Sequence, residues 1–416
     1  MAVILAYGSP ALGHLFPLAA LLSELVERGH DVHLHTMSGG VSDMRAAGIH
    51  AEPVDPRIEA IIGEDWMARN ALDVLKISID VLCRRAVLEV EDLRAAIDRV
   101  RPDAMIVDAN CWGAISVADA LEVPWMVFSP FTPYLRSAGV PPFGPGLRPL
   151  PGIVGRLRDA AIRPFVTHLF DGRMLPRVNA IRTAVGAPTI RSVDELMRRA
   201  PLLLAVGGEP FEYPHPGWGS RAHLIGACIF EPRPAPAPDW VAAIDRPIVL
   251  VSTSSIKQAD AVLGRTALQA LAKEPVHVVA TFPAGVPPNL PQPTNATVCE
   301  FVPHGELLDR VCCVITHGGM GTTVKALERG VPVCAVPFAR DQAEVARRVE
   351  VAGCGIRLPA ERLTEARLRE AVRAAMTMTD GARRVAAGFA ATGGVQRGAS
   401  LVEEHLLRPA AKQVVE

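Results

Sequence analysis

The chain carries almost no net charge and no long apolar run. Its 43 Lys and Arg residues balance 44 Asp and Glu residues, for a formal net charge of −1. A chain so close to neutral has no global attraction for nucleic acid, because such binding depends on neutralising phosphates. No apolar stretch approaches the roughly 20 residues of a membrane-spanning helix, and the first residues lack the basic start and cleavage site of a signal peptide. We therefore expect an ordinary soluble enzyme.

Cysteine pairs and metal-ligand patterns are also missing. The eight cysteines include no CxxC pair, and those in expected strands should pack as small hydrophobes. Reduced thiols and a cytoplasmic location follow. No Asp-x-Asp pair ends a strand and the histidines lack ligand spacing, so we expect no metal ion and no resident cofactor. Glu89 and Glu91 fall in a helical pattern and are expected on its solvated face.

The chain divides at a Pro-Ala segment. The sequence EPRPAPAP at 231–238 is stiff and unsuited to a central strand. Strand and helix patterns alternate before it at α/β spacing, and the apolar run IVLVSTSS begins a second sheet after it. We place an amino-terminal domain at 1–230, a linker at 231–246, a second domain at 247–399 and a terminal helix at 400–416. Two domains also fit a chain of 416 residues, at about 100–200 residues each.

The first strand leads into a small-residue loop followed by a histidine. Val3 to Tyr7 is a short apolar run, Leu15 to Arg28 has helical periodicity, and the strand pattern DVHLHT follows. This order is typical of a doubly wound sheet, where ligands gather at the carboxyl ends of strands. Gly8 and Gly13 in the loop do not match GxGxxG, which excludes a dinucleotide fingerprint. His14 follows directly and is a candidate site residue.

The most informative segment is a second strand–helix–strand unit, which includes His317 to Gln342. Its sequence is HGGMGTTVKALERGVPVCAVPFARDQ. An apolar, β-branched run precedes it, and Thr322 to Arg329 has a helical pattern that stops at Gly330. A helix start carries unpaired N–H groups and a partial positive charge, so it suits a phosphate. Glycines let the anion approach the backbone, and His317 and Thr322 add side-chain donors. The unit therefore predicts a phosphate site.

This segment resembles the donor-binding signature of the family 1 glycosyltransferases, which include the UDP-glycosyltransferases and the macrolide and antibiotic glycosyltransferases. The resemblance implies an α/β fold of GT-B architecture, with two Rossmann-like, doubly wound domains facing each other across a cleft. In that architecture the last helix crosses back to the first domain, here from about Ser400. Val302 matches the segment that holds the base through main-chain atoms. The residues implied to contact the diphosphate and the hexose are His317, Gly318, Gly319, Gly321, Thr322, Asp341 and Gln342.

The resemblance also implies a role for His14. Family members open with a small-residue loop, Gly-His and an apolar helix ending in RGH, and there the histidine is the catalytic base. An acceptor hydroxyl must lose a proton as it attacks the anomeric carbon, and a neutral imidazole titrates near the working pH. The base needs an orienting partner, and Asp108, at the end of an expected strand, matches the aspartate of the family. Asp103 is the alternative for that role, but it precedes the strand and better fits a residue that marks where the strand begins.

One loop departs from the family pattern. The strand leading to the diphosphate commonly ends in Gly-Ser or Gly-Thr, whereas this chain has Thr253, Ser254 and Ser255. Ser254 occupies the place of the glycine, which narrows the room for backbone approach. The hydroxyls of Ser254 and Ser255 are still expected to reach a phosphate, so both are counted as donor-binding residues.

Apolar and aromatic residues gather in the first domain. Ile58 to Val107 holds long helical segments rich in Met, Leu, Ile and Ala, and Phe128 to Phe143 is a loop with prolines and aromatic residues. Each such residue alone is more often plain core, but together they favour an apolar cleft for a lipophilic acceptor. The candidate acceptor-binding residues are Trp66, Met67, Trp112, Phe131 and Phe143.

Arginine dominates the segment 148–191. Eight arginines are opposed there only by Asp159 and Asp171. Part of the segment is either a basic amphipathic helix that touches an anionic membrane or a solvated helix of an acceptor lid. The second interpretation is preferred from the sequence.

These features predict an inverting, metal-independent transfer of a hexose from a nucleotide sugar to a hydroxyl of a hydrophobic natural product. UDP-glucose is the preferred donor, because Asp341 and Gln342 offer groups to several sugar hydroxyls; a dTDP-deoxysugar is the alternative. A nucleotide-sugar epimerase of the same architecture and a non-catalytic, nucleotide-sugar-binding helper protein remain open. The expected partners are the donor and the acceptor, with no nucleic acid and at most surface contact with a membrane. The chain is expected to be a monomer or a homodimer.

Overall fold

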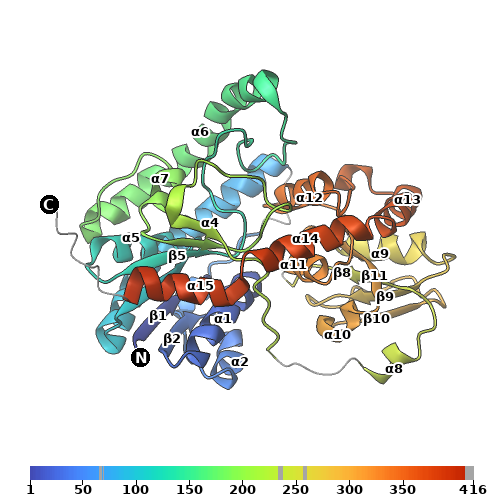
Figure 1. The fold of residues 1–416 in the computed structure, drawn as a ribbon, viewed down its shortest axis with the longest axis horizontal. Coiled ribbons are helices and arrows are strands. Elements are labelled where there is room, and N and C mark those ends of the chain that lie inside the picture. The colour runs from blue at the N-terminus through green and yellow to red at the C-terminus, as the bar shows by residue number, and fades with distance from the viewer. Residues whose placement is uncertain (65–67, 69, 233–237, 256–259, 408–416) are drawn as a thin grey trace.

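The molecule contains two parallel sheets in separate halves (Figure 1). The computed structural model describes residues 1–64, 68, 70–232, 238–255 and 260–407. Each sheet is flanked by helices, as the alternation of strand and helix patterns predicts. The expected α/β fold of two doubly wound domains is confirmed.

The first sheet has seven strands in the order β3-β2-β1-β4-β5-β6-β7, all paired in parallel. Because β1 lies between β2 and β4, the winding reverses there, and a crevice opens at the carboxyl ends of β1 and β4. His14 and Asp108 follow or end these two strands. The strands are β1 (Val3–Tyr7), β2 (Asp31–Thr36), β3 (His50–Pro53), β4 (Ala104–Asp108), β5 (Trp125–Ser129), β6 (Leu203–Ala205) and β7 (Ala222–Leu224).

The second sheet has six parallel strands in the order β10-β9-β8-β11-β12-β13. Its winding reverses between β8 and β11, so the loops after these two strands share a second crevice. The HGG segment follows β11 and the double serine follows β8. The strands are β8 (Ile248–Ser252), β9 (His277–Thr281), β10 (Ala296–Cys299), β11 (Val311–Thr316), β12 (Val333–Ala335) and β13 (Gly355–Arg357).

The helices lie close to where periodicity places them. Those of the first half are α1 (Leu12–Glu27), α2 (Val41–Ala46), α3 (Pro56–Glu59), α4 (Ala71–Val100), α5 (Trp112–Ala120), α6 (Gly152–Val185) and α7 (Val193–Arg198). Those that follow are α8 (Asp239–Ala242), α9 (Ala261–Ala270), α10 (His304–Leu308), α11 (Met320–Glu328), α12 (Gln342–Val351), α13 (Glu365–Met376), α14 (Thr379–Ala391) and α15 (Gly394–Val402). Within the described part of the chain, none is both long and apolar enough to cross a bilayer. The eight cysteines are free thiols.

The prediction that Glu89 lies on the solvated face of α4 is wrong. Its side chain is only 1% exposed, because α5 packs directly over this face of α4. The Glu89 carboxylate accepts the N–H of Gly113 at 2.8 Å and that of Ala114 at 3.4 Å. A Cβ at Gly113 would lie 1.9 Å from the carbonyl oxygen of Ala86, so glycine is what permits this close approach. Glu91, two residues away, is solvated as expected.

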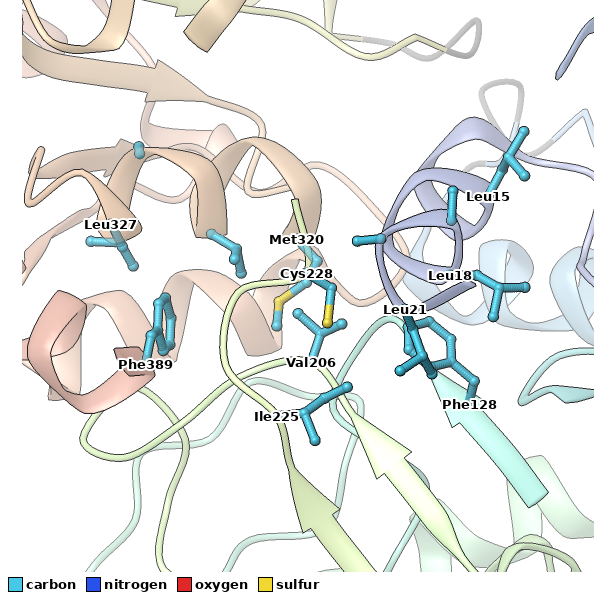
Figure 2. Close-up of a cluster of buried hydrophobic side chains, with 14 of the residues drawn as sticks. Leu15, Leu18, Leu21, Phe128, Val206, Ile225, Cys228, Met320, Leu327 and Phe389 are labelled. Carbon is cyan, nitrogen blue, oxygen red and sulfur yellow. The ribbon is translucent and has the colours of Figure 1, made fainter. Parts of the chain in front are cut away.

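One apolar cluster joins the two halves (Figure 2). Its members include Phe128 of β5 and residues of α1, of the segments after β6 and β7, and of α11 and α14. Burying this shared surface holds the two crevices in one arrangement. Labelled members are Leu15, Leu18, Leu21, Val206, Ile225, Cys228, Met320, Leu327 and Phe389.

The chain then crosses back to the first half through α15, which packs on α1. The Arg28 guanidinium of α1 donates to the carbonyl oxygen of Gln396 at 2.7 Å and pairs with Glu403 at 2.9 Å. The crossing helix begins at Gly394, ahead of the expected Ser400. Gly393, at φ +83°, ends the preceding helix and turns the chain.

Candidate active site

A histidine and an aspartate meet at the crevice of the first sheet. His14 lies in the first turn of α1 and Asp108 is the last residue of β4. Nδ1 of His14 lies 2.8 Å from Oδ2 of Asp108. The other carboxylate oxygen, Oδ1, accepts the backbone N–H of Asn110 at 2.8 Å, and the Asp108 side chain is fully buried. Both oxygens are thus held, and Nε2 of His14 is the ring nitrogen left for proton transfer.

The surroundings tune His14 as a base. Burial by itself lowers the pKa of His14, but the charge of Asp108 and its hydrogen bond act in the opposite direction. Asp341 of the second half adds to this rise and Arg85 opposes it, and the pKa ends above its ordinary value. The side chain keeps 18% of its surface exposed, so the imidazole is reachable from the cleft. This is the environment of a general base.

Aromatic rings extend from His14 into the first half. Phe131 meets the His14 ring edge-on, with 5.7 Å between centroids. Tyr134 lies 5.3 Å from Phe131, and Phe143 and Phe170 each lie 5.3 Å from Tyr134. We call these four residues, Phe131, Tyr134, Phe143 and Phe170, the aromatic cluster. It lies beside the candidate base, where an acceptor must sit.

The candidate acceptor residues differ in what they can offer. Trp112 stacks edge-on to Phe170 at 6.0 Å but is fully buried, so it supports the aromatic cluster from behind. Phe131 and Phe143 belong to the cluster itself, and Trp66 and Met67 lie outside the described residues. Tyr134 and Phe170 were not singled out from the sequence, because a lone aromatic residue in a loop or helix carries no motif.

The predicted phosphate site lies where α11 begins. No side chain caps this nine-residue helix, whose N-cap is Gly319, so its first N–H groups remain available to an anion. Gly318 has φ +85°, and a Cβ there would lie 3.2 Å from the carbonyl oxygen of Gln342. A Cβ on Gly319 would lie 2.4 Å from Nε2 of His317. The positive φ therefore favours glycine at Gly318, and a side chain at Gly319 would push against the imidazole of His317.

Two loops of the second half meet around His317. Its Nδ1 lies 3.6 Å from the Asp260 carboxylate, and the same carboxylate accepts the N–H of Ser254 at 2.6 Å. Burial lowers the pKa of His317, although the charge of Asp260 opposes this, and so favours the neutral imidazole. Ser255 is exposed, and Ser252 lies 3.5 Å from the hydroxyl of Thr322. Asp260 lies in no recognisable motif, and only the fold brings it to this loop.

The Asp-Gln pair begins α12. Burial raises the pKa of Asp341, and the charge of His14 opposes that rise. The charges of His14 in the first half and Asp341 in the second half therefore influence each other. Gln342 is 2% exposed, and its Oε1 accepts the N–H groups of Phe338 at 2.8 Å and Ala339 at 3.0 Å. Arg340, at φ +58°, is held in a left-handed conformation beside this pair.

The expected base-binding segment precedes α10. Val302 is buried, whereas Phe301 is 72% exposed. Burial, with the charge of Lys325, lowers the pKa of His304 to about 4. Lys325 lies 3.8 Å from Glu231. Among the described residues, no three His, Cys, Asp or Glu side chains come together in a way that could hold a metal ion.

The first half thus presents a His–Asp pair, and the second half presents an uncapped helix start across the same cleft. Two doubly wound domains arranged in this way define the GT-B class of glycosyltransferases.

Known proteins identify the family more closely. The model of the erythromycin biosynthesis protein CIII-like C-terminal domain matches residues 265–404. The 4'-demethylrebeccamycin synthase of Lentzea aerocolonigenes is 30% identical over 392 residues, covering 90% of this chain and 91% of that protein. The NDP-glycosyltransferase YjiC of Bacillus subtilis is 24% identical and covers 97% of each chain. The solved structure of the calicheamicin glycosyltransferase CalG4 matches with a TM-score of 0.75 over 99% of both chains, at 22% identity. The chain belongs to the family 1 glycosyltransferases and is an enzyme that transfers a sugar.

Proposed function

We propose that the enzyme transfers a hexose from a nucleoside diphosphate sugar to a hydroxyl of a hydrophobic natural product, with inversion and without a metal ion. The observation that carries the proposal is the 2.8 Å contact between His14 and Asp108, within the electrostatic reach of Asp341. It puts a candidate base of one half next to the candidate sugar-binding residue of the other.

The chemistry is a single displacement. Nε2 of His14 takes the proton of the acceptor hydroxyl as its oxygen forms a bond to the anomeric carbon. The bond from that carbon to the diphosphate oxygen breaks on the opposite face, so the configuration inverts. Asp108 holds the imidazole through Nδ1 and stabilises the imidazolium that forms. A positioned base of this kind contributes about 10²–10⁴-fold.

The departing diphosphate needs positive charge and hydrogen-bond donors. The first N–H groups of α11 and the hydroxyl of Thr322 supply donors that are already oriented before reaction. His317 lies beside this helix start and is a further polar group near the departing diphosphate. The hydroxyls of Ser254 and Ser255 approach from the loop after β8. Since these groups are fixed by the fold, they stabilise the developing charge without having to rearrange.

Two nucleotide sugars are candidates for the donor. UDP-glucose is supported by the hydrogen-bonding capacity of Asp341 and by a 25% identical relative named zeaxanthin glucosyltransferase, from Pseudescherichia vulneris. A dTDP-deoxysugar is supported by the similar solved structures of glycosyltransferase VinC in complex with dTDP and of spinosyn rhamnosyltransferase SpnG complexed with thymidine diphosphate. The side-chain amide oxygen of Gln342, Oε1, already accepts two loop N–H groups, which removes one partner that a fully hydroxylated sugar would use. This observation favours the deoxysugar.

The acceptor is proposed from the aromatic cluster beside His14. Stacked and edge-on rings favour a flat or ring-containing apolar molecule. The names of relatives, 4'-demethylrebeccamycin synthase and demethyllactenocin mycarosyltransferase, are consistent with a natural product. The epimerase and the non-catalytic helper find no support, since relatives over most of the chain are named for synthesis or glycosyl transfer.

A mass-spectrometric screen tests this function. UDP-glucose and several dTDP-sugars are each incubated with a mixed panel of polyketide, flavonoid and macrolide acceptors, with and without EDTA. A product heavier than its acceptor by one sugar residue is expected, unaffected by EDTA and strongly reduced with His14→Ala. Release of altered free sugar without any acceptor product would instead indicate an epimerase.

A further inference from the structure

The amino-terminal half of α6 exposes an apolar stripe. Four large side chains there each keep about two thirds of their surface exposed, namely Ile153 at 64%, Val154 at 68%, Leu157 at 64% and Phe165 at 66%. Leu150, just before the helix, is 38% exposed. At 100° per residue, the four helical side chains fall within about one third of the helix circumference. We call these five residues the α6 stripe.

The α6 stripe is set apart from the body of the molecule. Figure 1 shows the beginning of α6 projecting beyond the rest of the structure at the top of the view. Scattered single apolar residues on a surface are ordinary, but a contiguous exposed patch marks an interaction site. A solvated lid helix, the interpretation preferred from the sequence, does not account for an apolar face of this kind.

Charge around the stripe has a single sign. Residues 130–185 contain eight arginines and two aspartates, a formal balance of +6 within a chain of −1. Both aspartates are buried: Asp159 pairs with Arg158, and Asp171 with Arg136. The segment therefore presents no exposed carboxylate. Four guanidinium groups make no ion pair within the described part of the chain, those of Arg148, Arg156, Arg163 and Arg173.

A basic hollow lies next to the stripe. Its volume is about 480 Å³, and Arg163, His168 and Arg191 line it together with the Arg136–Asp171 pair. Pro164, which precedes Phe165 of the stripe, is part of its wall. Cationic side chains beside exposed apolar ones form the pattern with which helices bind anionic bilayers in the plane of the interface.

We propose that the α6 stripe and its arginines dock the enzyme on the surface of an anionic lipid bilayer. The stripe enters the boundary between headgroups and acyl chains, and the guanidinium groups meet lipid phosphates. Phe170, farther along the same helix, belongs to the aromatic cluster beside His14. Docking therefore brings the acceptor site close to the bilayer, from which an apolar acceptor dissolved in lipid can enter.

Sedimentation with lipid vesicles tests the proposal. The full-length enzyme is mixed with vesicles of phosphatidylcholine alone or of phosphatidylcholine with phosphatidylglycerol. Binding is expected only with phosphatidylglycerol, and it should weaken as the Debye length falls from about 10 Å at 0.1 M salt to about 3 Å at 1 M. Leu157→Glu with Phe165→Glu, and separately Arg156→Glu, should each reduce the bound fraction about tenfold or more.

Matched variants elsewhere control for general effects of charge. Val262→Glu replaces an apolar residue of α9 that is 47% exposed, and Arg367→Glu changes an exposed arginine of α13. Both should bind vesicles like the unaltered protein. Because every substituted side chain is on the surface, circular dichroism and melting temperature should stay unchanged, which shows that loss of binding is not loss of folding.

Other results overturn the proposal. Equal sedimentation of all variants, or no binding by the unaltered enzyme, rules out docking through α6. If Leu157→Glu instead converts an oligomer to a monomer in light scattering, the stripe is an interface between copies of the chain. Docking is independent of the proposed chemistry: transfer to a water-soluble acceptor that persists without vesicle binding rejects the docking alone.

Discussion

At the residue scale, the basicity of His14 depends on one carboxylate. Asp108 is fully buried and holds Nδ1 at 2.8 Å. Burial lowers the pKa of His14, but the charge and the hydrogen bond of Asp108, together with the charge of Asp341, raise it above its ordinary value. His14→Ala should reduce turnover by about 10²–10⁴-fold, because the acceptor proton then has no base. Calorimetric affinity for the nucleotide should be nearly unchanged. Turnover close to that of the unaltered enzyme would remove His14 from the role of base.

The same pair sets the pH dependence. Only neutral His14 accepts a proton, so turnover should fall as the pH drops through the raised pKa of His14. Asp108→Asn removes the charge that raises this pKa, and the acid limb of the rate profile should move to lower pH, with a lower plateau. Asp103→Asn is the control, since the exposed Asp103 carboxylate accepts the N–H of Val3 at the other end of β4. An acid limb unmoved by Asp108→Asn would contradict the assignment.

Thr322 lies in the first turn of α11 and is proposed to contact the diphosphate. Thr322→Ala should weaken nucleotide binding by about 1.5–3 kcal/mol, the usual contribution of a hydrogen bond to a charged group. Thr322→Ser keeps the hydroxyl and should bind nearly as tightly. Titration calorimetry with UDP and dTDP measures both. Equal affinity for the Ala and Ser variants would show that the hydroxyl makes no such contact.

At the element scale, Glu89 of α4 is hydrogen-bonded to the first turn of α5. That turn directly follows Asn110 and Cys111. Burial raises the pKa of Glu89 to about 8, although the N–H groups of Gly113 and Ala114 partly offset it. The folded protein thus holds a proton on Glu89 that the unfolded chain releases near pH 4.5. The stabilisation from this group is present at low pH and is lost as the pH rises towards 8.

Glu89→Gln should therefore flatten the decline of the melting temperature between about pH 5 and pH 8, because glutamine does not titrate. Glu91→Gln is the matched control, since Glu91 lies on the same helix with 79% of its side chain exposed. Differential scanning calorimetry over this range compares the two. Parallel curves for both variants and the unaltered protein would show that Glu89 does not titrate as inferred.

Strand and helix positions could be predicted well, for local reasons. Buried parallel strands such as 311–316 are continuous apolar runs, and Gly330 and Gly393 have the positive φ angles that helix ends need. Glu89 was misplaced because periodicity shows that a helix has a polar face, but does not show which neighbour covers it. The same reason applies to Trp112, a candidate acceptor-binding residue. The sequence does not distinguish an aromatic residue that lines a site from one buried behind the lining.

At the scale of the whole molecule, buried charges hold α12 against the first half. Arg348 contacts both carboxylate oxygens of Glu212, at 2.8 and 2.9 Å, and pairs with Glu344 at 2.8 Å. Glu344 also accepts the N–H groups of Gly144 and Gly146, each at 2.8 Å. Burial alone would raise the pKa of Glu212, but the charge of Arg348 and the hydrogen bonds with His215 and Thr132 together bring it down to about 2. The loop next to Phe143 is thereby fixed to the helix that begins after Asp341.

Arg348→Ala leaves two carboxylates buried without their cation, so the free energy of unfolding should fall by about 3–5 kcal/mol. Arg329→Ala is the control: its ion pair with Asp309 is exposed on both sides, at 42% and 55%, and the loss should stay below about 1 kcal/mol. Denaturant unfolding measures both. A comparable, small loss for the two variants would show that this network does not hold the halves together.

The sequence by itself determined the two strand–helix–strand units and the residues that match the family signature, because these depend on local periodicity, glycine positions and short motifs. Tertiary structure alone decided which distant residues share a site: Asp260 beside His317, Tyr134 and Phe170 beside His14, and Glu344 beside the loop at Gly146. It also decided that the apolar side chains at the start of α6 remain exposed. The reason is physical: burial and charge pairing are properties of neighbours in space, and the order of residues along the chain does not specify them.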